Sequence, residues 1–371
     1  MTDTRPGRDT IDGADAGAGR VEAAATHEVL VAGRAGVPAN AASVVLNVTA
    51  VDASAAGFAT VWPCGVDRPL ASNVNFERGD TRPNSVIAKV GVDGKVCVFS
   101  SQAIDAVVDV AGYFPTTEGF TPLGAPGRLT DTRAGSATVD GADAGSGAIS
   151  GDGVHEVKVA GRAGVPAGAA SVVLNVTAVD AGGAGFATVY PCGVPRPLAS
   201  NVNFVAGATV PNSVIARVGT EGKVCVYSSQ KVDAVVDVAG YFPGTDGFLP
   251  LDEPRRVLDT RTGFATVDGV DAGGGAVAAD AVHEVTVAGR AGVPGSAASV
   301  VLNVTAVDAS AAGFATVFPC GVPRPLASNV NFVAGATVPN SVIAKVGADG
   351  KVCIYSSQKI DAVIDIAGYF P

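Results

Sequence analysis

The chain repeats itself in strict register. The triplet Asp-Thr-Arg begins at Asp3, Asp131 and Asp259, so that successive copies are 128 residues apart with no insertion or deletion between them. A period of this size is that of a domain, well above the roughly 20 to 50 residues of a solenoid repeat. The predicted organisation is therefore three copies of one unit, each long enough to bury a core of its own.

Composition and residue alternation indicate an all-β fold. The chain has 48 glycines and 22 prolines, and no long stretch has the 3.6-residue apolar spacing of a helix. In the middle copy the alternation predicts strands at 155–161, 171–180, 185–192, 212–219, 223–229 and 233–242, with shorter pieces near LTDTR and NVNF. Seven or eight strands in about 120 residues favour an antiparallel β-sandwich, of jelly-roll or immunoglobulin-like type. Closed β-barrel modules, or a pseudo-threefold assembly of the copies, are the alternatives.

Short connectors are expected between the modules. The predicted modules are 1–115, 131–243 and 259–371, with connectors at 116–130 and 244–258. Proline, glycine and acidic residues in these connectors are typical of linkers. Phe120, Leu123 and Leu129 are apolar enough to dock on a module, however, so we expect a semi-ordered connector with limited freedom.

The six cysteines fall one pair per copy, with 33 positions between partners. The pairs are Cys64 with Cys97, Cys192 with Cys225, and Cys320 with Cys353. This pattern predicts one disulfide in each module. A zinc site is the competing interpretation, but two thiolates and one histidine per copy, without CxxC spacing, fall short of four ligands.

Disulfides that persist imply an oxidising compartment, so a secreted or cell-surface protein is expected. The sequence begins inside a repeat, with MTDTRPG, and a secretion signal is therefore expected to lie outside it. A net charge of -10 and a pI near 4.8 argue against nucleic acid or an anionic membrane as partner. No stretch approaches 18 apolar residues, so no membrane span is predicted. The expected partners are a cell-wall or surface glycan, or further copies of the chain, and no cofactor is predicted.

Taken in order, the motifs resemble a known repeat module. The middle copy runs through RLTDTR, VAGRAGVP, SVVLNVTAVD, PCGVPRPLASNVNF, VPNSVIARVG, KVCVYSS and DAVVDVAGYF. This succession resembles a tandem repeat module of secreted and surface proteins of actinobacteria, found alone or beside hydrolase and peptidase domains. The resemblance implies an extracellular accessory module, and it carries over no functional residues.

The residue types do not assemble a catalytic constellation. His155 and Glu156 are neighbours in a predicted strand and point to opposite faces, and HExxH, GxSxG and P-loop motifs are absent. Asp237 shares a face with the aspartate four residues before it, but about 13 Å separates the two, beyond the roughly 5 to 9.5 Å of glycosidase pairs. Asp237 is expected to pair with Arg133 or Arg162. We therefore predict that the chain is not an enzyme.

Three aspartate-rich loops raise the question of calcium. IDGADAG at 11–17, VDGADAG at 139–145 and VDGVDAG at 267–273 each set two carboxylates three residues apart among glycines. Calcium prefers such oxygen ligands. Neither the EF-hand pattern nor the glycine-rich nonapeptide is present, and Asp-Gly is ordinary turn chemistry. A turn is the favoured interpretation, with calcium as the alternative, and no metal is predicted.

One stretch is a candidate recognition surface: ATVYPCGVPRPLASNVNF at 187–204, with near copies at 59–76 and 315–332. Its aromatic position holds Trp, Tyr or Phe, which preserves a flat ring. A ring beside an arginine and two asparagines could stack on a sugar whose hydroxyls bind the amides. The candidate ligand-binding residues are Trp62, Arg68, Asn73, Asn75, Tyr190, Arg196, Asn201, Asn203, Phe318, Arg324, Asn329 and Asn331. The alternative is that the ring packs inside while the asparagines satisfy loop backbone.

The sequence therefore predicts a non-catalytic extracellular repeat protein for surface attachment or scaffolding, with weak glycan or cell-wall binding by each module. Weak sites in tandem gain avidity when all of them can engage at once. The alternative is a purely structural spacer, or a self-assembling subunit, without ligand.

Overall fold

The computed structural model of the chain describes residues 1–117 and 119–371; residue 118, within the expected connector 116–130, lies outside the described residues. The described residues form strands and three short 3-10 turns. The first repeat contributes β1 (Thr2–Asp3), β2 (Ala25–Leu30), β3 (Ser43–Val51), β4 (Gly57–Pro63), β5 (Val74–Phe76), β6 (Thr81–Lys89), the turn η1 (Val92–Gly94), β7 (Lys95–Ser100) and β8 (Asp105–Phe114). The second contributes β9 (Thr121–Asp131), β10 (Gly153–Lys158), β11 (Ser171–Val179), β12 (Gly185–Pro191), β13 (Val202–Phe204), β14 (Val210–Arg217), η2 (Thr220–Gly222), β15 (Lys223–Ser228) and β16 (Asp233–Phe242). The third contributes β17 (Leu249–Asp259), β18 (Ala281–Thr286), β19 (Ser299–Val307), β20 (Gly313–Pro319), β21 (Val330–Phe332), β22 (Val338–Lys345), η3 (Ala348–Gly350), β23 (Lys351–Ser356) and β24 (Asp361–Phe370).

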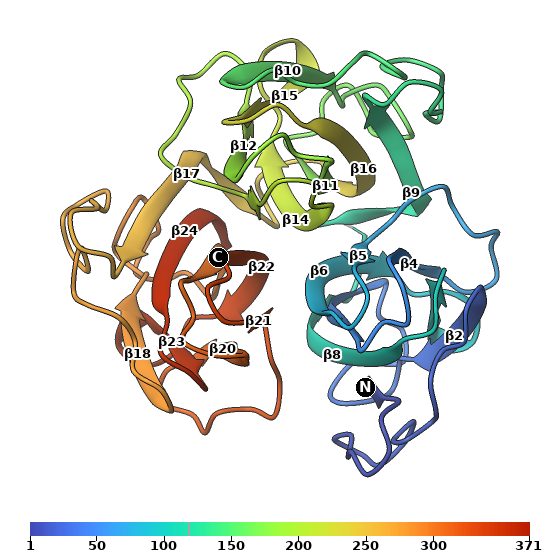
Figure 1. The fold of residues 1–371 in the computed structure, drawn as a ribbon, viewed down its shortest axis with the longest axis horizontal. Coiled ribbons are helices and arrows are strands. Elements are labelled where there is room, and N and C mark those ends of the chain that lie inside the picture. Colours follow the sequence, from blue (N-terminus) through green and yellow to red (C-terminus); the bar gives the residue numbers. More distant parts are fainter. Residues whose placement is uncertain (118) are drawn as a thin grey trace.

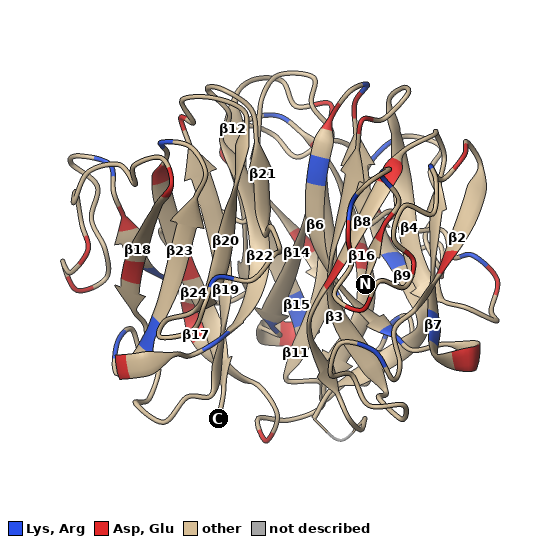
Figure 2. Ribbon diagram, turned by 90° about the horizontal axis from the view of Figure 1, so that it is seen from below, with Lys and Arg blue, Asp and Glu red and all other residues tan. Residues whose placement is uncertain are grey.

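These strands form six antiparallel four-stranded sheets, arranged as a six-bladed β-propeller (Figure 1). The strand orders, from the outer strand toward the axis, are β1-β8-β3-β6, β2-β7-β4-β5, β9-β16-β11-β14, β10-β15-β12-β13, β17-β24-β19-β22 and β18-β23-β20-β21. Each repeat supplies two of the blades. Seen from the side, the strands run from one end of the molecule toward the other (Figure 2).

The expectation of three jelly-roll or immunoglobulin-like sandwich modules is wrong, and so is the β-barrel alternative, although the all-β class is confirmed. The physical reason lies in the central strands, which are apolar on both faces. On β11, Val172 and Leu174 pack into the core of the second repeat, while Val173 on the opposite face belongs to a separate cluster shared with the other repeats. A free-standing sandwich would present that second face to water as polar residues. In the propeller it is covered by the neighbouring repeats instead.

Within each repeat the two blades share one hydrophobic core. In the second repeat this core contains Ala234, Val236 and Val238 of β16, the alternate positions that the sequence pattern predicts to be buried. Val189 of β12 and Val226 of β15 meet them from the other blade. The alternation of valine with other residues therefore correctly identifies which face of each strand is core.

Three asparagines join the repeats to one another near the axis. Asn84 on β6 donates through Nδ2 to Oδ1 of Asn175 in the second repeat at 2.7 Å, and its own Oδ1 accepts from the backbone N of Ser213 at 3.0 Å. Asn212 makes the same two contacts with the third repeat, and Asn340 makes them with the first. All three asparagines are buried. Each satisfied amide thus ties one repeat to the next, and the third back to the first.

The segments expected as connectors, 116–130 and 244–258, contain the outermost strands β9 and β17. These strands pair with β16 and β24 respectively. The docking expected for the apolar residues is found: Phe120 and Leu129 are fully buried, and Leu123 packs against the core of the second repeat. Most of the described residues of both segments therefore belong to strands of the blades.

Candidate ligand-binding surface

The three predicted disulfides are confirmed. Cys64 bonds to Cys97, Cys192 to Cys225, and Cys320 to Cys353. In the second repeat, Cys225 on β15 lies opposite Tyr190 on β12, the first residue of the candidate site. Each disulfide therefore attaches the loop after β4, β12 or β20 to the neighbouring strand of the same blade.

The rings of the candidate site pack on these disulfides. Trp62, Tyr190 and Phe318 are 5%, 6% and 5% exposed, and each clusters with the two cysteines of its own repeat. The Trp62 indole also donates through Nε1 to the carbonyl of Val66 at 3.0 Å. The aromatic ring that was a candidate for stacking on a sugar is therefore buried in each repeat.

The asparagines of the candidate site hold the loop that follows the disulfide. Asn73, Asn201 and Asn329 each accept a backbone hydrogen bond at 2.7 Å, from Val61, Val189 and Val317. The second set accepts from a serine three residues earlier; it comprises Asn75 with Ser72, Asn203 with Ser200, and Asn331 with Ser328. These amides satisfy the loop itself, which is the alternative role weighed for them.

The arginines of the candidate site are exposed and stack on aromatic rings. The guanidinium carbon of Arg68 lies 3.8 Å from the centroid of Phe99, that of Arg196 lies 4.1 Å from Tyr227, and that of Arg324 lies 4.0 Å from Tyr355. Among the described residues, no hydrogen bond or ion pair joins any of the three guanidinium groups to the rest of the chain. Stacking holds each guanidinium flat and leaves its N–H groups at the edge available to an acceptor.

The aromatic rings beneath the arginines form pairs that the sequence analysis did not single out. Phe186 lies 5.8 Å from Tyr227, centroid to centroid, and equivalent pairs occur in the other two repeats. Tyr227 also donates its hydroxyl to Asp152 at 2.5 Å, which raises the pKa of the tyrosine. A signal was present in KVCVYSS, because a residue two places after Cys225 in a strand shares its face. We name Arg68 with Phe99, Arg196 with Tyr227, and Arg324 with Tyr355 the arginine–aromatic surfaces.

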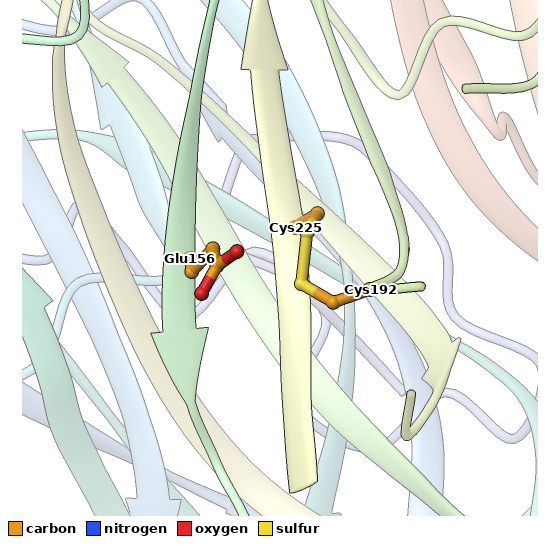
Figure 3. A group of neighbouring side chains, drawn as sticks. All are labelled: Glu156, Cys192 and Cys225. Carbon is orange, nitrogen blue, oxygen red and sulfur yellow. A yellow bond between two sulfur atoms is a disulfide. The ribbon is translucent and has the colours of Figure 1, made fainter. Parts of the chain in front are cut away.

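Side chains of the metal-binding type gather beside one disulfide. Among the described residues, ligand atoms of Glu156, Cys192 and Cys225 lie within 4.8 Å of one another (Figure 3). The two sulfurs are bonded to each other and are not thiolates, the form that binds metals. Glu156 instead accepts a hydrogen bond from Lys223 at 2.9 Å, which raises the pKa of Lys223. The cluster is a disulfide with a surface ion pair beside it.

The carboxylates of the aspartate-rich loops bind side chains of the chain itself. Asp140 receives two hydrogen bonds from Arg162, at 2.6 and 2.8 Å, and this guanidinium lowers the pKa of Asp140 to about 2. Asp143 accepts a hydrogen bond from the hydroxyl of Thr130 at 2.6 Å, and its Oδ2 atom lies 2.9 Å from Nε2 of His155. Both carboxylates thus bind side chains of the protein and do not need a metal ion as partner, which favours the turn interpretation of these loops.

The histidine of the third repeat has a different environment for an identifiable reason. Leu258 stands where the second repeat has Thr130, so Asp271 has no hydroxyl partner and pairs with Arg290 at 2.9 Å. The Nε2 atom of His283 is consequently buried without a hydrogen-bond partner among the described residues.

The prediction that Asp237 pairs with Arg133 or Arg162 is wrong. Arg133 binds Asp131 at 2.7 Å and Arg162 binds the loop aspartate, whereas Asp237 accepts from Nε of Arg128 at 2.9 Å. Arg128 lies on β9, in the segment expected to be a connector, and was therefore not considered. Burial raises the pKa of Asp237, against the opposing effect of Arg128. The expectation that this carboxylate serves an ion pair holds, with a different arginine.

Comparison with known proteins gives matches among solved structures alone. No protein-family model matches the chain, and no curated protein matches it. Among solved structures, a chain of Sulfolobus turreted icosahedral virus is similar over 93% of this chain and 84% of the viral chain, with 9% sequence identity and a TM-score of 0.19. So low a score carries no argument about fold or function. No helix in the described part of the chain has the length and apolar character to cross a membrane.

Proposed function

We propose that the chain is a non-catalytic, secreted or surface-exposed scaffold that binds a glycan carrying carboxylate groups through its three arginine–aromatic surfaces. The observation that carries this proposal is the exposed, unpaired state of three equivalent guanidinium groups in a protein with a net charge of -10. Arginine presents a planar set of N–H donors that matches a carboxylate. A free guanidinium on an acidic protein therefore favours an acidic partner at that point.

The three surfaces belong to one propeller and occur once in each repeat. Each is held by a ring beneath the guanidinium and by the disulfide loop beside it, so it does not need to be ordered on binding. A polymer with repeating acidic sugars could engage more than one surface at once, and binding that is weak at each surface would gain by avidity. The disulfides support an extracellular location, because they persist in oxidising compartments.

The proposal is tested by binding to polygalacturonate, with neutral dextran as the reference polymer. We expect the combined Arg68→Ala, Arg196→Ala and Arg324→Ala variant to bind polygalacturonate at least tenfold more weakly in affinity electrophoresis. Binding by the unmodified chain should also weaken as salt rises, because charged contacts are screened.

The chain provides a matched control at another set of equivalent exposed positions. The combined Lys89→Ala, Arg217→Ala and Lys345→Ala variant removes the same charge outside the arginine–aromatic surfaces. Retained binding by this control would locate the effect at the stacked arginines. An equal loss in both variants, or no loss in either, would remove the proposed surfaces.

A further inference from the structure

A hollow, which we name the first-repeat hollow, lies where four loops of the first repeat meet. Its volume is about 330 Å³, and Arg20, Asp52, Ser54, Arg78 and Ala103 are among the residues that line it. Arg20 precedes β2, the next two residues follow β3, Arg78 lies in the turn between β5 and β6, and Ala103 lies between β7 and β8. Ligand pockets measure roughly 300 to 1,000 Å³, so this hollow has the size of a site for a small molecule.

Three of the lining residues differ from both other repeats at positions 128 residues apart. Two arginines stand where the other repeats have alanine, and an alanine stands where they have lysine. The positions are Arg20 with Ala148 and Ala276, Arg78 with Ala206 and Ala334, and Ala103 with Lys231 and Lys359. At this one place the first repeat therefore has two guanidinium groups more, and one ammonium group fewer, than its copies.

The short side chain of Ala103 leaves room that a lysine takes in the second repeat. A Cβ atom added to Gly182, the counterpart of Ser54, would lie 3.5 Å from the Cβ atom of Lys231. The lysine side chain therefore begins beside this position. In the first repeat the side chain ends at Cβ, and the space beyond it belongs to the hollow.

Arg20 forms a fixed wall of the hollow. Its Nη1 atom donates to the carboxylates of Asp52 and Asp105 at 3.0 and 3.3 Å, and its Nη2 atom donates to the carbonyls of Asp52 and Ala103 at 2.5 and 3.2 Å. Among the described residues, no hydrogen-bond acceptor faces its Nε–H group. One donor of this immobilised guanidinium is therefore available to a ligand.

Arg78 contributes a guanidinium group that no carboxylate of the described chain neutralises. The carboxylate in the same turn, Asp80, binds Arg82 at 3.0 Å and also accepts from the backbone N of Glu77 at 3.0 Å. The turn itself is attached to the loop after β3, because the backbone N of Gly79 donates to the carbonyl of residue 53 at 2.8 Å. Arg78 is exposed and has no hydrogen bond or ion pair within the described part of the chain. It therefore presents a free cation on an anchored turn.

We propose that the first-repeat hollow binds the carboxylate or phosphate group of a small hydroxylated ligand, with the anion on Arg78 and on Nε of Arg20. Guanidinium groups match such oxyanions in shape and charge. The Asp52 carboxylate at the opposite side accepts hydrogen bonds only, so it requires a donor such as a ligand hydroxyl, and the Ser54 hydroxyl can serve another. A sugar with one acidic group offers both kinds of contact.

This inference is separate from glycan binding at the arginine–aromatic surfaces, because none of their residues lines the hollow. The test is an NMR titration of the full ¹⁵N-labelled chain with glucuronate, with glucose 6-phosphate and with glucose as the neutral reference. We expect saturable shifts of the backbone N–H signals of Gly79 and Ser54 with an acid and none with glucose. The tighter of the two acids identifies the preferred anionic group. No saturable shift with either acid, or an equal response to glucose, would overturn the proposal.

The first variant is Arg78→Ala, which removes the free guanidinium from an exposed turn. We expect the dissociation constant of the acid to rise about tenfold, as for loss of a hydrogen bond between charged groups. Arg8→Ala is the matched control, since it removes the same charge from an exposed position of the same repeat outside the hollow. Equal weakening by both variants would trace the effect to net charge and contradict a site at the hollow.

The second variant is Ala103→Lys, which introduces the residue of the other two repeats. It adds a positive charge, so attraction by charge alone predicts tighter binding of the acids. Occupation of the hollow predicts the reverse, because the lysine side chain takes the space of the ligand. We expect loss of the Gly79 shift with an unchanged unfolding temperature, since Lys231 and Lys359 stand at this position in the same fold. Unchanged or tighter binding would overturn the proposal.

The combined Arg68→Ala, Arg196→Ala and Arg324→Ala variant separates this site from the arginine–aromatic surfaces. We expect it to retain the Gly79 shift with glucuronate or glucose 6-phosphate, whether or not the original chain binds polygalacturonate. Loss of the shift in this variant would assign the acid to the stacked arginines and remove the hollow as a binding site.

Discussion

At the scale of the residue, equivalent side chains behave differently because their neighbours differ. Asp237 and Asp365 form ion pairs with Arg128 and Arg256, whereas no arginine forms an ion pair with Asp109 among the described residues. Burial raises the pKa of Asp109 to about 6, the N-terminal ammonium opposing this only in part. The same residue type at equivalent positions of the three repeats therefore does not imply the same electrostatic environment.

Asp109 makes a testable contribution to the pH dependence of stability. Its folded pKa of about 6 lies above that of an unfolded aspartate, about 3.9. The protonated form is therefore favoured in the folded state, and the stability it contributes is present below pH 4 and lost as the pH rises through about 6. Asp109→Asn removes the charge and keeps an acceptor oxygen. We expect this variant to gain stability relative to the original chain between pH 4 and pH 7, as measured by urea unfolding.

The exposed Asp67→Asn replacement is the control, with no expected change of that kind. A difference between Asp109→Asn and the original chain that stays constant from pH 4 to pH 7 would contradict the assignment.

At the scale of the element, alternation predicted six strands of the middle repeat, but it predicted neither the full length of β9 and β17 nor what covers the second face of each strand. The strand β11 has buried residues at eight consecutive positions, including the polar Asn175 and Thr177. A pattern of period two identifies one core face, and Val173 on the other face was the sign that this face is covered as well. The disulfides were predictable because each copy holds only two cysteines at a constant spacing, so each cysteine has one candidate partner within its own copy. Each disulfide attaches a loop to a strand of its own blade.

Removing one disulfide should destabilise a blade without unmaking the fold. For Cys192→Ala combined with Cys225→Ala, we expect the free energy of unfolding to fall by about 2 to 4 kcal/mol, since the bridge closes a loop of 33 residues. Tyr190 would also lose the sulfur surface on which it packs. The measurement is chemical unfolding, with the unmodified chain under identical non-reducing conditions as reference. Unchanged stability would show that the loop is held by its hydrogen bonds alone.

At the scale of the whole molecule, the repeats are joined by a directional ring of buried amides. Each of Asn84, Asn212 and Asn340 contacts the next repeat, and the last contact returns to the first. Burial of these groups is favourable only while all of their partners are present, because an unpaired polar group in the interior is costly. The closed ring therefore couples the stability of the three repeats.

Asn212→Ala should consequently weaken the molecule as a unit. The change leaves the backbone N of Ser341 and Oδ1 of Asn303 without their partner, and each such group costs roughly 1 to 3 kcal/mol. We expect a large loss of stability in a single transition, monitored by circular dichroism during thermal unfolding. The exposed Asn40→Ala should change stability by less than about 0.5 kcal/mol. Unfolding in separate steps, with only part of the signal affected, would contradict coupling between the repeats.

Sequence by itself determined the threefold repeat, the all-β class, the approximate positions of six strands of the middle repeat and the three disulfides, because each depends on residues close in sequence or on a constant spacing. The 11-residue strands β9 and β17 lie in segments that were expected to be connectors. Tertiary structure alone decided that the sheets form a propeller, that Arg128 binds Asp237, and that the rings at Trp62, Tyr190 and Phe318 are buried. The propeller depends on what covers the second face of the central strands, and that cover includes residues of other repeats. The ion pair and the buried rings depend on contacts within one repeat between residues that are far apart in the sequence. Local patterning specifies neither kind of contact, because it reports only which face of a strand is apolar.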